Sequence, residues 1–272
     1  LVVDRSYRDG MTIERELFLA RKDLECRVRA ESLDGNYVVS MSGRTIVYKG
    51  LVVGTELGRF FSDLSHPSYQ SAMAIFHQRY STNTHPTWEL AQPFRTLAHN
   101  GEINTLDGNR DWMRAREGEL NSAIFGSDVD LLKPLTDDDG SDSYSLDHAL
   151  ELLTLSGRDI MHSAMMLIPE AWRAVPGMPQ PLRDFYAYHA CLMEPWDGPA
   201  ALAFSDGRWV CGSLDRNGLR PARYVVTDED TVVMASEVGV IELDDAHIVE
   251  KGRLGPGRMI AIDLETGILL KD

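Results

Sequence analysis

Two shortages in the sequence exclude whole classes of protein. Its 272 residues contain three cysteines, Cys26, Cys191 and Cys211, which are widely separated and form no CxxC pair. An odd, scattered set of this kind favours neither a zinc site nor a disulfide framework, so a reducing, cytosol-like compartment is expected. No apolar run approaches the roughly 18–20 residues that cross a bilayer. The opening LVVDRSYRDGMTIERE lacks a basic segment followed by an apolar one and is not a signal peptide.

Positive charge is also scarce. Lys and Arg number 27 against 42 Asp and Glu, which gives a net charge of −15 and a pI near 4.9. A surface this acidic repels phosphate backbones, so we expect no nucleic-acid partner. The phosphate-binding patterns GxGxxG and GxxxxGKS are absent. His77, His85 and His99 show no HExxH or comparable zinc spacing, so we expect no metal site.

The remaining composition is that of an ordinary globular chain. Hydrophobic residues make up 43% and charged residues 25%. A chain of this length can bury a core as one large domain or two small ones. Without internal repeats or a clear linker, the economical interpretation is one α+β domain that mixes antiparallel sheets with helices. The chain opens with Leu1 rather than Met, so we expect the natural protein to begin upstream.

Hydrophobic periodicity and turn residues predict most of the elements. Helices are expected over residues 11–30, 55–64, 104–120, 145–155 and 182–193. Strands are expected over residues 36–50 (two runs split at Ser42-Gly43), 71–80 and 94–101. Three hairpins are expected in the last third, over residues 200–215 (turning at Asp206-Gly207), 222–237 and 258–272.

Three polar positions are candidates for substrate binding. Arg79, in HQRYST, could grip a carboxylate through two hydrogen bonds, or it could be a structural surface arginine. Asn100-Gly101, in HNGEIN, offers amide and backbone donors that could form an oxyanion hole, or it could be a plain turn. Asp142, in GSDSYSLD, could bind an ammonium group or cap the next helix. Together, these residues could hold both charged ends of an α-amino acid and its reactive carbonyl.

The cysteines are the other candidate nucleophiles. Cys191 falls in an apolar helical stretch and Cys211 in the middle of an expected strand. Both positions favour buried, inert thiols.

Two sets of sequence blocks carry a resemblance to a known family. The short blocks are RYST, HNG, SDS and DRNGLRP, and they resemble class II glutamine amidotransferases in general. The long blocks are FHQRYSTNTHPTWELAQPFRTLAHNGEINTLDGNRDWM, MEPWDGPAALAFSDGRWV and EKGRLGPGRMIAIDLETG. These resemble the amidotransferase domain of the glutamate synthase large (alpha) subunit. The resemblance covers nearly the whole chain and is weaker in the first forty residues.

The resemblance implies a fold and a set of residue roles. The fold is an N-terminal nucleophile (Ntn) hydrolase-like αββα sandwich of antiparallel sheets, incomplete at the N-terminus, with residues 1–272 forming the C-terminal part of a single domain. Arg79 would bind the α-carboxylate of glutamine and Asp142 its α-amino group, while Asn100 and the Gly101 N–H would form the oxyanion hole. Supporting roles are implied for Ser81, Thr82, His99, Glu102, Asp215 and Arg220.

The family also implies a nucleophile that this sequence lacks. That nucleophile is a processed N-terminal cysteine whose α-amine acts as the base, and no cysteine opens this chain. We therefore expect it upstream of Leu1 and expect this chain alone to be inactive. In the intact parent, in the cytoplasm or in a plant or algal plastid, L-glutamine would be hydrolysed and its ammonia used to aminate 2-oxoglutarate reductively. FMN, an iron–sulfur cluster and a small NADPH-oxidising subunit or ferredoxin are implied for other parts of the parent, and no cofactor for this chain.

Three alternatives stay open on the sequence. The chain could be a catalytically inactive module that binds glutamine or glutamate, or a self-contained hydrolase that uses Cys191 or Cys211. It could also come from another class II amidotransferase.

Overall fold

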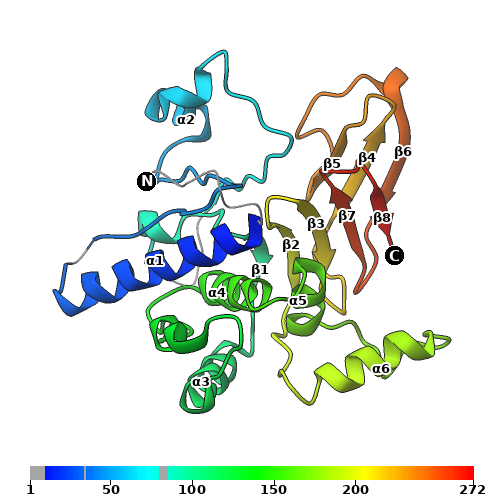
Figure 1. Ribbon diagram of the computed structural model, residues 1–272. Coiled ribbons are helices and arrows are strands. Elements are labelled where there is room, and N and C mark those ends of the chain that lie inside the picture. Colours follow the sequence, from blue (N-terminus) through cyan, green and yellow to red (C-terminus); the bar gives the residue numbers. More distant parts are fainter. Residues whose placement is uncertain (1–9, 34, 80–84) are drawn as a thin grey trace. The chain divides into compact units, whose positions relative to one another are not determined.

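The computed structural model describes residues 10–33, 35–79 and 85–272, and the chain divides into two compact units. Unit 1 comprises Leu1–Thr96 and Arg110–Arg158, and unit 2 comprises Leu97–Asn109 and Asp159–Asp272. Within the described residues, unit 1 contains helices and irregular segments, whereas every strand belongs to unit 2 (Figure 1).

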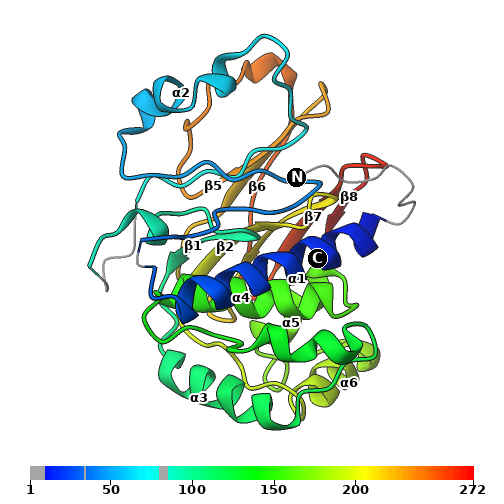
Figure 2. The ribbon, with the colours of Figure 1, turned by 60° about the vertical axis from the view of Figure 1, so that its left-hand side comes forward.

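Two long helices make up the centre of unit 1. Helix α1 (Gly10–Ala30) and helix α4 (Asp142–Leu155) lie side by side in two views (Figures 1 and 2). Their buried residues include both apolar and polar side chains, and an ion pair joins the helices, from Arg21 Nη2 to Glu151 Oε2 at 2.5 Å. The predicted helices over residues 11–30 and 145–155 are therefore confirmed.

Shorter helical elements account for two more predictions. The expected helix at 55–64 is a succession of three short pieces: η1 (Gly54–Glu56), α2 (Leu57–Phe60) and η2 (Ser62–Ser65). Helix α3 (Leu106–Arg116) and the turn η4 (Glu117–Glu119) fall within the expected 104–120. The remaining 3₁₀ turns are η3 (Trp88–Leu90), η5 (Gly126–Leu132) and η6 (Asp245–His247).

Helix α4 begins three residues earlier than the apolar pattern predicts. The Ser141 hydroxyl accepts a hydrogen bond from the Tyr144 backbone N–H at 3.1 Å, so Ser141 is the cap and Asp142 is the first helical residue. The alternative of Asp142 as the cap is therefore wrong. A carboxylate in the first helical turn is favoured by the helix dipole.

Unit 2 contains two antiparallel sheets. One has the order β1-β2-β3-β7-β8 and the other the order β5-β4-β6. A buried cluster of Leu214, Ala222, Leu254 and Ile260 draws its side chains from both sheets or from their ends. The strands are β1 (Leu97–Gly101), β2 (Ala200–Ser205), β3 (Trp209–Leu214), β4 (Arg223–Thr227), β5 (Val232–Ala235), β6 (Ile248–Arg253), β7 (Met259–Asp263) and β8 (Leu269–Lys271). The predicted α+β class, which combines helices with antiparallel sheets, is confirmed.

The three predicted hairpins are confirmed as β2–β3, β4–β5 and β7–β8. The turn of the first hairpin is stabilised by residues within the turn itself. Gly207 has a φ of +84°, and the Asp206 carboxylate accepts hydrogen bonds from the N–H groups of Arg208 and Trp209 at 3.0 and 2.8 Å. This is the conformation that an Asp-Gly pair favours.

Other predicted elements differ from the structure. Residues 36–50 and 71–79 lie in irregular segments without strand pairing to other described residues. A strand is stable only with a partner, so an apolar, β-branched run does not define one by itself. Helix α5 (Ile160–Leu167) was not predicted, although its buried residues Ile160, Ser163, Ala164 and Leu167 recur at helical spacing. Strand β6 was also missed, and helix α6 (Gln180–His189) ends four residues before the prediction.

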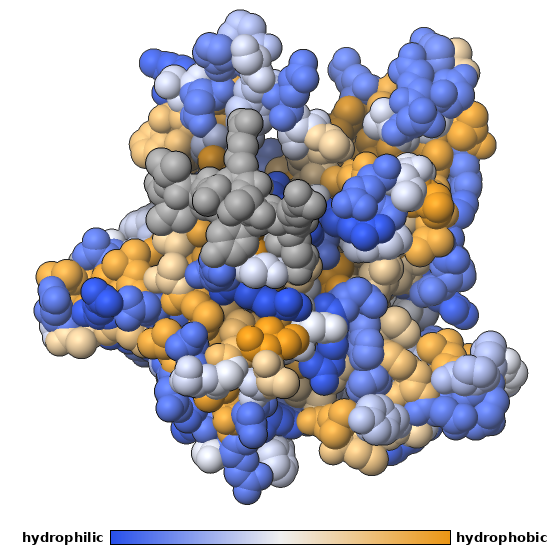
Figure 3. All heavy atoms as spheres, viewed as in Figure 1, coloured by the Kyte–Doolittle hydropathy of each residue, from blue (hydrophilic) through white to orange (hydrophobic). Residues whose placement is uncertain are grey.

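Among the described residues, no helix combines the length and the apolar character needed to cross a membrane. The face drawn in Figure 3 mixes hydrophilic and apolar side chains.

Candidate functional site

At the end of strand β1, two stretches of backbone pass so close together that only glycine fits at Gly101 and at Gly198. This close approach is called the corner below. Gly101 has a φ of +148°, and a Cβ added there would lie 1.7 Å from the backbone oxygen of Pro199. The opposing Gly198 is equally confined, since its Cβ would lie 1.8 Å from the oxygen of Glu102. The two backbones therefore approach more closely than any other residue allows.

Hydrogen bonds hold this corner on both sides. The Glu102 N–H donates to the Pro199 oxygen at 3.0 Å, and the Asn104 N–H donates to the Asp197 oxygen at 2.7 Å. Asn100, one residue before Gly101, is exposed, whereas His99 is buried. The arrangement presents an amide side chain at the edge of a rigid backbone corner. Fixed donors of this kind can stabilise a developing oxyanion.

Asp215, the residue that follows strand β3, supports the same corner. Its carboxylate, 1% exposed, accepts hydrogen bonds from the N–H groups of Ala200 at 2.8 Å, Asn217 at 2.8 Å and Gly218 at 3.2 Å. Ala200 is the residue paired with Gly101 across β1 and β2. Asp215 therefore helps to fix the backbone opposite the proposed oxyanion hole, while Arg220 of the same loop is exposed.

The two residues predicted to hold the charged ends of the substrate belong to unit 1. Arg79 is exposed, and its backbone N–H donates to His77 Nδ1 at 3.1 Å. Asp142 is buried at the start of α4, where its carboxylate accepts from the Ser143 N–H at 2.7 Å. Ser81 and Thr82 lie outside the described residues. Asn100, Gly101, His99, Glu102, Asp215 and Arg220 belong to unit 2.

A buried polar network anchors helix α4, and the sequence did not predict it. The Asp147 carboxylate, 0% exposed, accepts from the Arg95 N–H at 3.3 Å, the Thr96 N–H at 2.8 Å and the Thr96 hydroxyl at 2.6 Å. Burial raises the pKa of Asp147, while the Thr96 bonds oppose that rise. The Arg95 guanidinium donates to Glu25 at 2.8 Å and to the Val38 oxygen at 2.7 Å. The sequence feature that could have indicated this network is Asp147, the second aspartate of SDSYSLD, which lies five residues after Asp142 on the same helix.

The two cysteines considered as nucleophiles, Cys211 and Cys191, differ in their surroundings. Cys211 is buried in β3, as predicted, and burial raises the pKa of its thiol. Cys191 is exposed, so its predicted burial is wrong. It lies beyond the end of α6, in the turn that leaves the helix, where the chain no longer packs an apolar face. Its thiol faces the Ala187 oxygen at 3.5 Å, a contact that does not activate a nucleophile.

The described residues contain no group of three or more His, Cys, Asp or Glu side chains that could hold a metal ion. Three cysteines are also fewer than the four thiolates that bind a common iron–sulfur cluster, so these residues do not fit that group.

Comparison with known proteins defines the class. Residues 1–272 match the sequence profile of the class-II glutamine amidotransferases, and the chain belongs to this family. The resemblance seen in the sequence is thereby confirmed.

Its similarity to individual proteins is more specific. The chain is 50% identical over 265 residues to the glutamate synthase [NADPH] large chain of Bacillus subtilis, covering 97% of this chain and 17% of that protein. It is 51% identical over 265 residues to the chloroplastic ferredoxin-dependent glutamate synthase of Oryza sativa, covering 96% and 16%. The chain thus spans about a sixth of the length of these relatives. A solved structure of the B. subtilis glutamine phosphoribosylpyrophosphate amidotransferase matches with a TM-score of 0.37 and 21% identity, covering 72% of this chain and 33% of that one.

Proposed function

We propose that this chain forms part of the glutaminase site of a glutamate synthase, with residues 1–272 belonging to a single amidotransferase domain. The observation that carries the proposal is the identity of about 50% to glutamate synthase large chains over 97% of this chain. The glycine-only corner at Gly101, beside the exposed Asn100, supports it.

Each proposed binding residue has a distinct role. The Arg79 guanidinium takes the α-carboxylate of L-glutamine, and the Asp142 carboxylate takes its α-ammonium group. The side-chain amide of Asn100 and the N–H of Gly101 receive the oxygen of the side-chain carbonyl. Both donors direct an N–H group at this oxygen, so their hydrogen bonds strengthen as negative charge develops on it during attack. His99, Glu102, Asp215 and Arg220 support the site, as do Ser81 and Thr82.

The reaction then proceeds as acyl transfer. A cysteine thiol attacks the amide carbon of glutamine and passes its proton to the leaving nitrogen, so ammonia departs and a thioester remains. Water hydrolyses the thioester to glutamate and restores the thiol. Cys211 is buried with a raised pKa, and Cys191 has no activating contact among the described residues. Cys26 is half-buried, and its thiol faces the Lys133 oxygen at 3.8 Å, which does not activate it either. None of the three thiols therefore fits the role of the nucleophile.

The remaining steps belong to the parent protein. Ammonia from this site would be consumed in the reductive amination of 2-oxoglutarate by other domains, which would hold FMN and an iron–sulfur cluster. The electrons would come from a small NADPH-oxidising subunit or from ferredoxin, since relatives of both kinds match this chain. The corresponding compartment is the cytoplasm, or the plastid in a plant or alga.

Kinetics of glutamine hydrolysis by the parent protein test these roles. Arg79→Ala should raise KM roughly 10- to 100-fold, because a charge-assisted bidentate contact is worth about 1.5–3 kcal/mol. Asn100→Ala should mainly lower kcat, by roughly 10²–10³, because an oxyanion-hole donor acts in the transition state. Arg59→Ala is the matched control, since Arg59 is an exposed arginine of the same unit that pairs with Glu56. Unchanged kinetics in both Arg79→Ala and Asn100→Ala would remove the assignments.

A further inference from the structure

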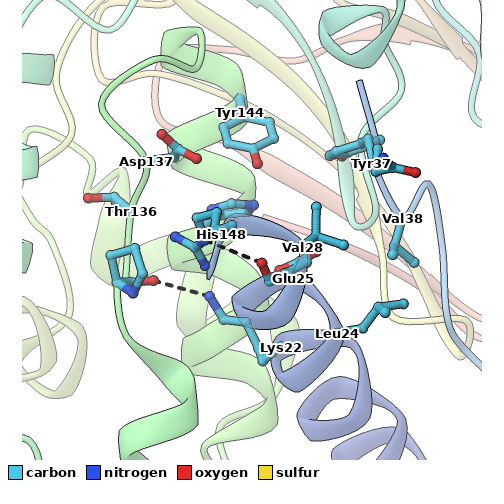
Figure 4. A pocket seen from close by; sticks show the side chains of 13 residues that line it. Lys22, Leu24, Glu25, Val28, Tyr37, Val38, Thr136, Asp137, Tyr144 and His148 are labelled. Atoms are coloured by element: carbon cyan, nitrogen blue, oxygen red, sulfur yellow. Dashed lines mark hydrogen bonds between the residues drawn. The ribbon is translucent and has the colours of Figure 1, made fainter. Parts of the chain in front are cut away.

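A cavity of about 250 Å³ lies within unit 1, where α1 and α4 meet the segment around Tyr37. Figure 4 shows Tyr144 and His148 of α4 facing Lys22 and Glu25 of α1 across this space. The lining combines polar side chains with an apolar wall formed by Leu24, Val28, Val38 and Pro134.

Lys22 brings a buried positive charge to the cavity. The residue is 6% exposed, and its ammonium donates to the Pro134 oxygen at 3.1 Å. An ammonium has three N–H donors, so two remain for a partner in the cavity. Burial lowers the pKa of Lys22 to about 8, so the group is still mostly charged at neutral pH. A buried charge with unused donors is costly unless an acceptor meets it.

His148 adds a donor that has no acceptor. The residue is 9% exposed, and its Nε2 lies 3.1 Å from Arg95 Nη1. A guanidinium only donates, so Nε2 accepts and the ring proton resides on Nδ1. Burial lowers the pKa of His148, which keeps the ring neutral. The Nδ1 atom has no hydrogen-bond partner in the part of the chain that the structure describes.

The other charged side chains leave the cavity basic. The Glu25 carboxylate already accepts hydrogen bonds from Arg21 and Arg95, both at 2.8 Å, and is neutralised by them. Arg29 lies two helical turns beyond Lys22 on the same face of α1. Asp137 remains as an opposing carboxylate, and one of its oxygens accepts from the Asp139 N–H at 3.2 Å.

We propose that this cavity binds a small organic carboxylate, with its carboxylate group facing Lys22, His148 and the Tyr144 hydroxyl and its carbon chain against Val28 and Val38. The volume exceeds that of a bare inorganic anion, and the apolar wall accounts for the remaining space. The buried donors supply what a carboxylate oxygen accepts.

This cavity is separate from the proposed glutamine site. Neither Arg79 nor Asp142 lines it. Asp142 and Tyr144 are two residues apart on α4, so their side chains leave the helix about 200° apart. The carboxylate site therefore stands independently of the glutaminase proposal, and failure of either leaves the other in place.

Calorimetric titration of the 272-residue chain with glutarate tests the inference. Glutarate should bind saturably, and its uncharged counterpart glutaramide should bind at least tenfold more weakly. Absence of saturable glutarate binding, or equal binding of the diamide, would overturn the proposal.

Variants locate the binding. Lys22→Met keeps the stem of the side chain and should weaken glutarate binding at least tenfold. Lys251→Met removes the same charge from an exposed lysine that pairs with Asp245, and should leave binding unchanged. Tyr144→Phe deletes only a hydroxyl, so it retains the ring contacts with Phe94 and Tyr37 and should weaken binding severalfold even where Lys22→Met fails to fold. Unaltered affinity in Tyr144→Phe, or equal affinities in the two lysine variants, would place the ligand elsewhere.

Discussion

At the scale of single residues, Gly101 is the position with the least freedom in the proposed site. Gly101→Ala would place a methyl group 1.7 Å from the Pro199 oxygen at a φ of +148°. Backbone oxygens cannot retreat as a side chain can, so the free energy of unfolding should fall by about 2–4 kcal/mol. Urea denaturation measures the change.

Gly108→Ala is the matched control for that substitution. Gly108 lies in α3 and has no heavy atom within 4 Å of its added methyl group. Alanine favours a helix interior over glycine by up to about 1 kcal/mol, so this variant should be slightly more stable. Equal losses in the two variants would show that the corner at Gly101 is not constrained as described.

Lys49 is the residue whose ionisation should be visible in the stability of the fold. It is buried, and its ammonium lies 4.7 Å and 4.5 Å from the ring centroids of Tyr37 and Phe94. Its Nζ has no hydrogen-bond partner among the described residues, and burial lowers its pKa from 10.5 to about 7. Between pH 7 and 10 the unfolded chain therefore binds more protons than the folded chain at this residue, and stability should rise with pH.

Lys49→Met tests this sign. The variant removes the cost of the buried charge, so below pH 7 it should exceed the parent in stability by about 1–3 kcal/mol. The advantage should shrink as the pH approaches 10, where the charge is being lost from the unfolded chain as well. Thermal or urea denaturation at pH 6.5, 8 and 9.5 gives the differences, with Lys251→Met as the exposed control. An advantage that grows with pH would contradict the assignment.

At the scale of elements, the first turn of α4 depends on one hydroxyl. Ser141 is buried and accepts from the Tyr144 N–H at 3.1 Å. Ser141→Ala should lower the free energy of unfolding by about 1 kcal/mol, whereas Ser141→Gly should cost only a few tenths, because glycine is tolerated at a cap. Urea denaturation separates the two values. If alanine cost no more than glycine, the hydroxyl would not be the cap.

Helices, strands and turns were mostly predictable from the sequence where the interactions that stabilise them join residues close together in the chain. The turn at Asp206-Gly207 follows from the φ of Gly207 and two hydrogen bonds of Asp206, all within four residues. Residues 36–50 failed as strands because pairing depends on a partner elsewhere in the chain. Helix α5 was missed although its cap is local: the Asp159 carboxylate accepts from the His162 N–H at 2.7 Å.

The same division applies to the candidate site. Asn100, Gly101 and Asp142 could be proposed from short motifs, because each motif contains its own donors or charges. The role of Asp215 behind Ala200, and the bonds of Asp147 to Arg95 and Thr96, join residues 15 to 52 positions apart. No spacing rule predicts such bonds, so only the fold reveals them.

At the scale of the whole molecule, the net charge of −15 is the dominant feature. Exposed ion pairs such as Arg114–Asp111 and Lys251–Asp245 contribute about 0–1 kcal/mol each, so screening them costs little. Repulsion among the excess carboxylates opposes the compact state and is screened by the same salt. The Debye length falls from about 30 Å at 0.01 M salt to about 10 Å at 0.1 M. Exposed charges that lie farther apart than this length no longer repel one another appreciably.

Raising NaCl from 10 to 150 mM should therefore raise the thermal unfolding midpoint, by about 2–4 °C for a net gain of roughly 1 kcal/mol in a chain of this size. Differential scanning calorimetry measures the midpoint, and sucrose at matched osmolality controls for effects unrelated to charge. The gain should be smaller at pH 5, close to the pI of 4.9, because little net charge then remains to be screened. A midpoint that falls with salt at pH 7.5 would mean that the attractive ion pairs outweigh the repulsion. The excess carboxylates would then not destabilise the folded state.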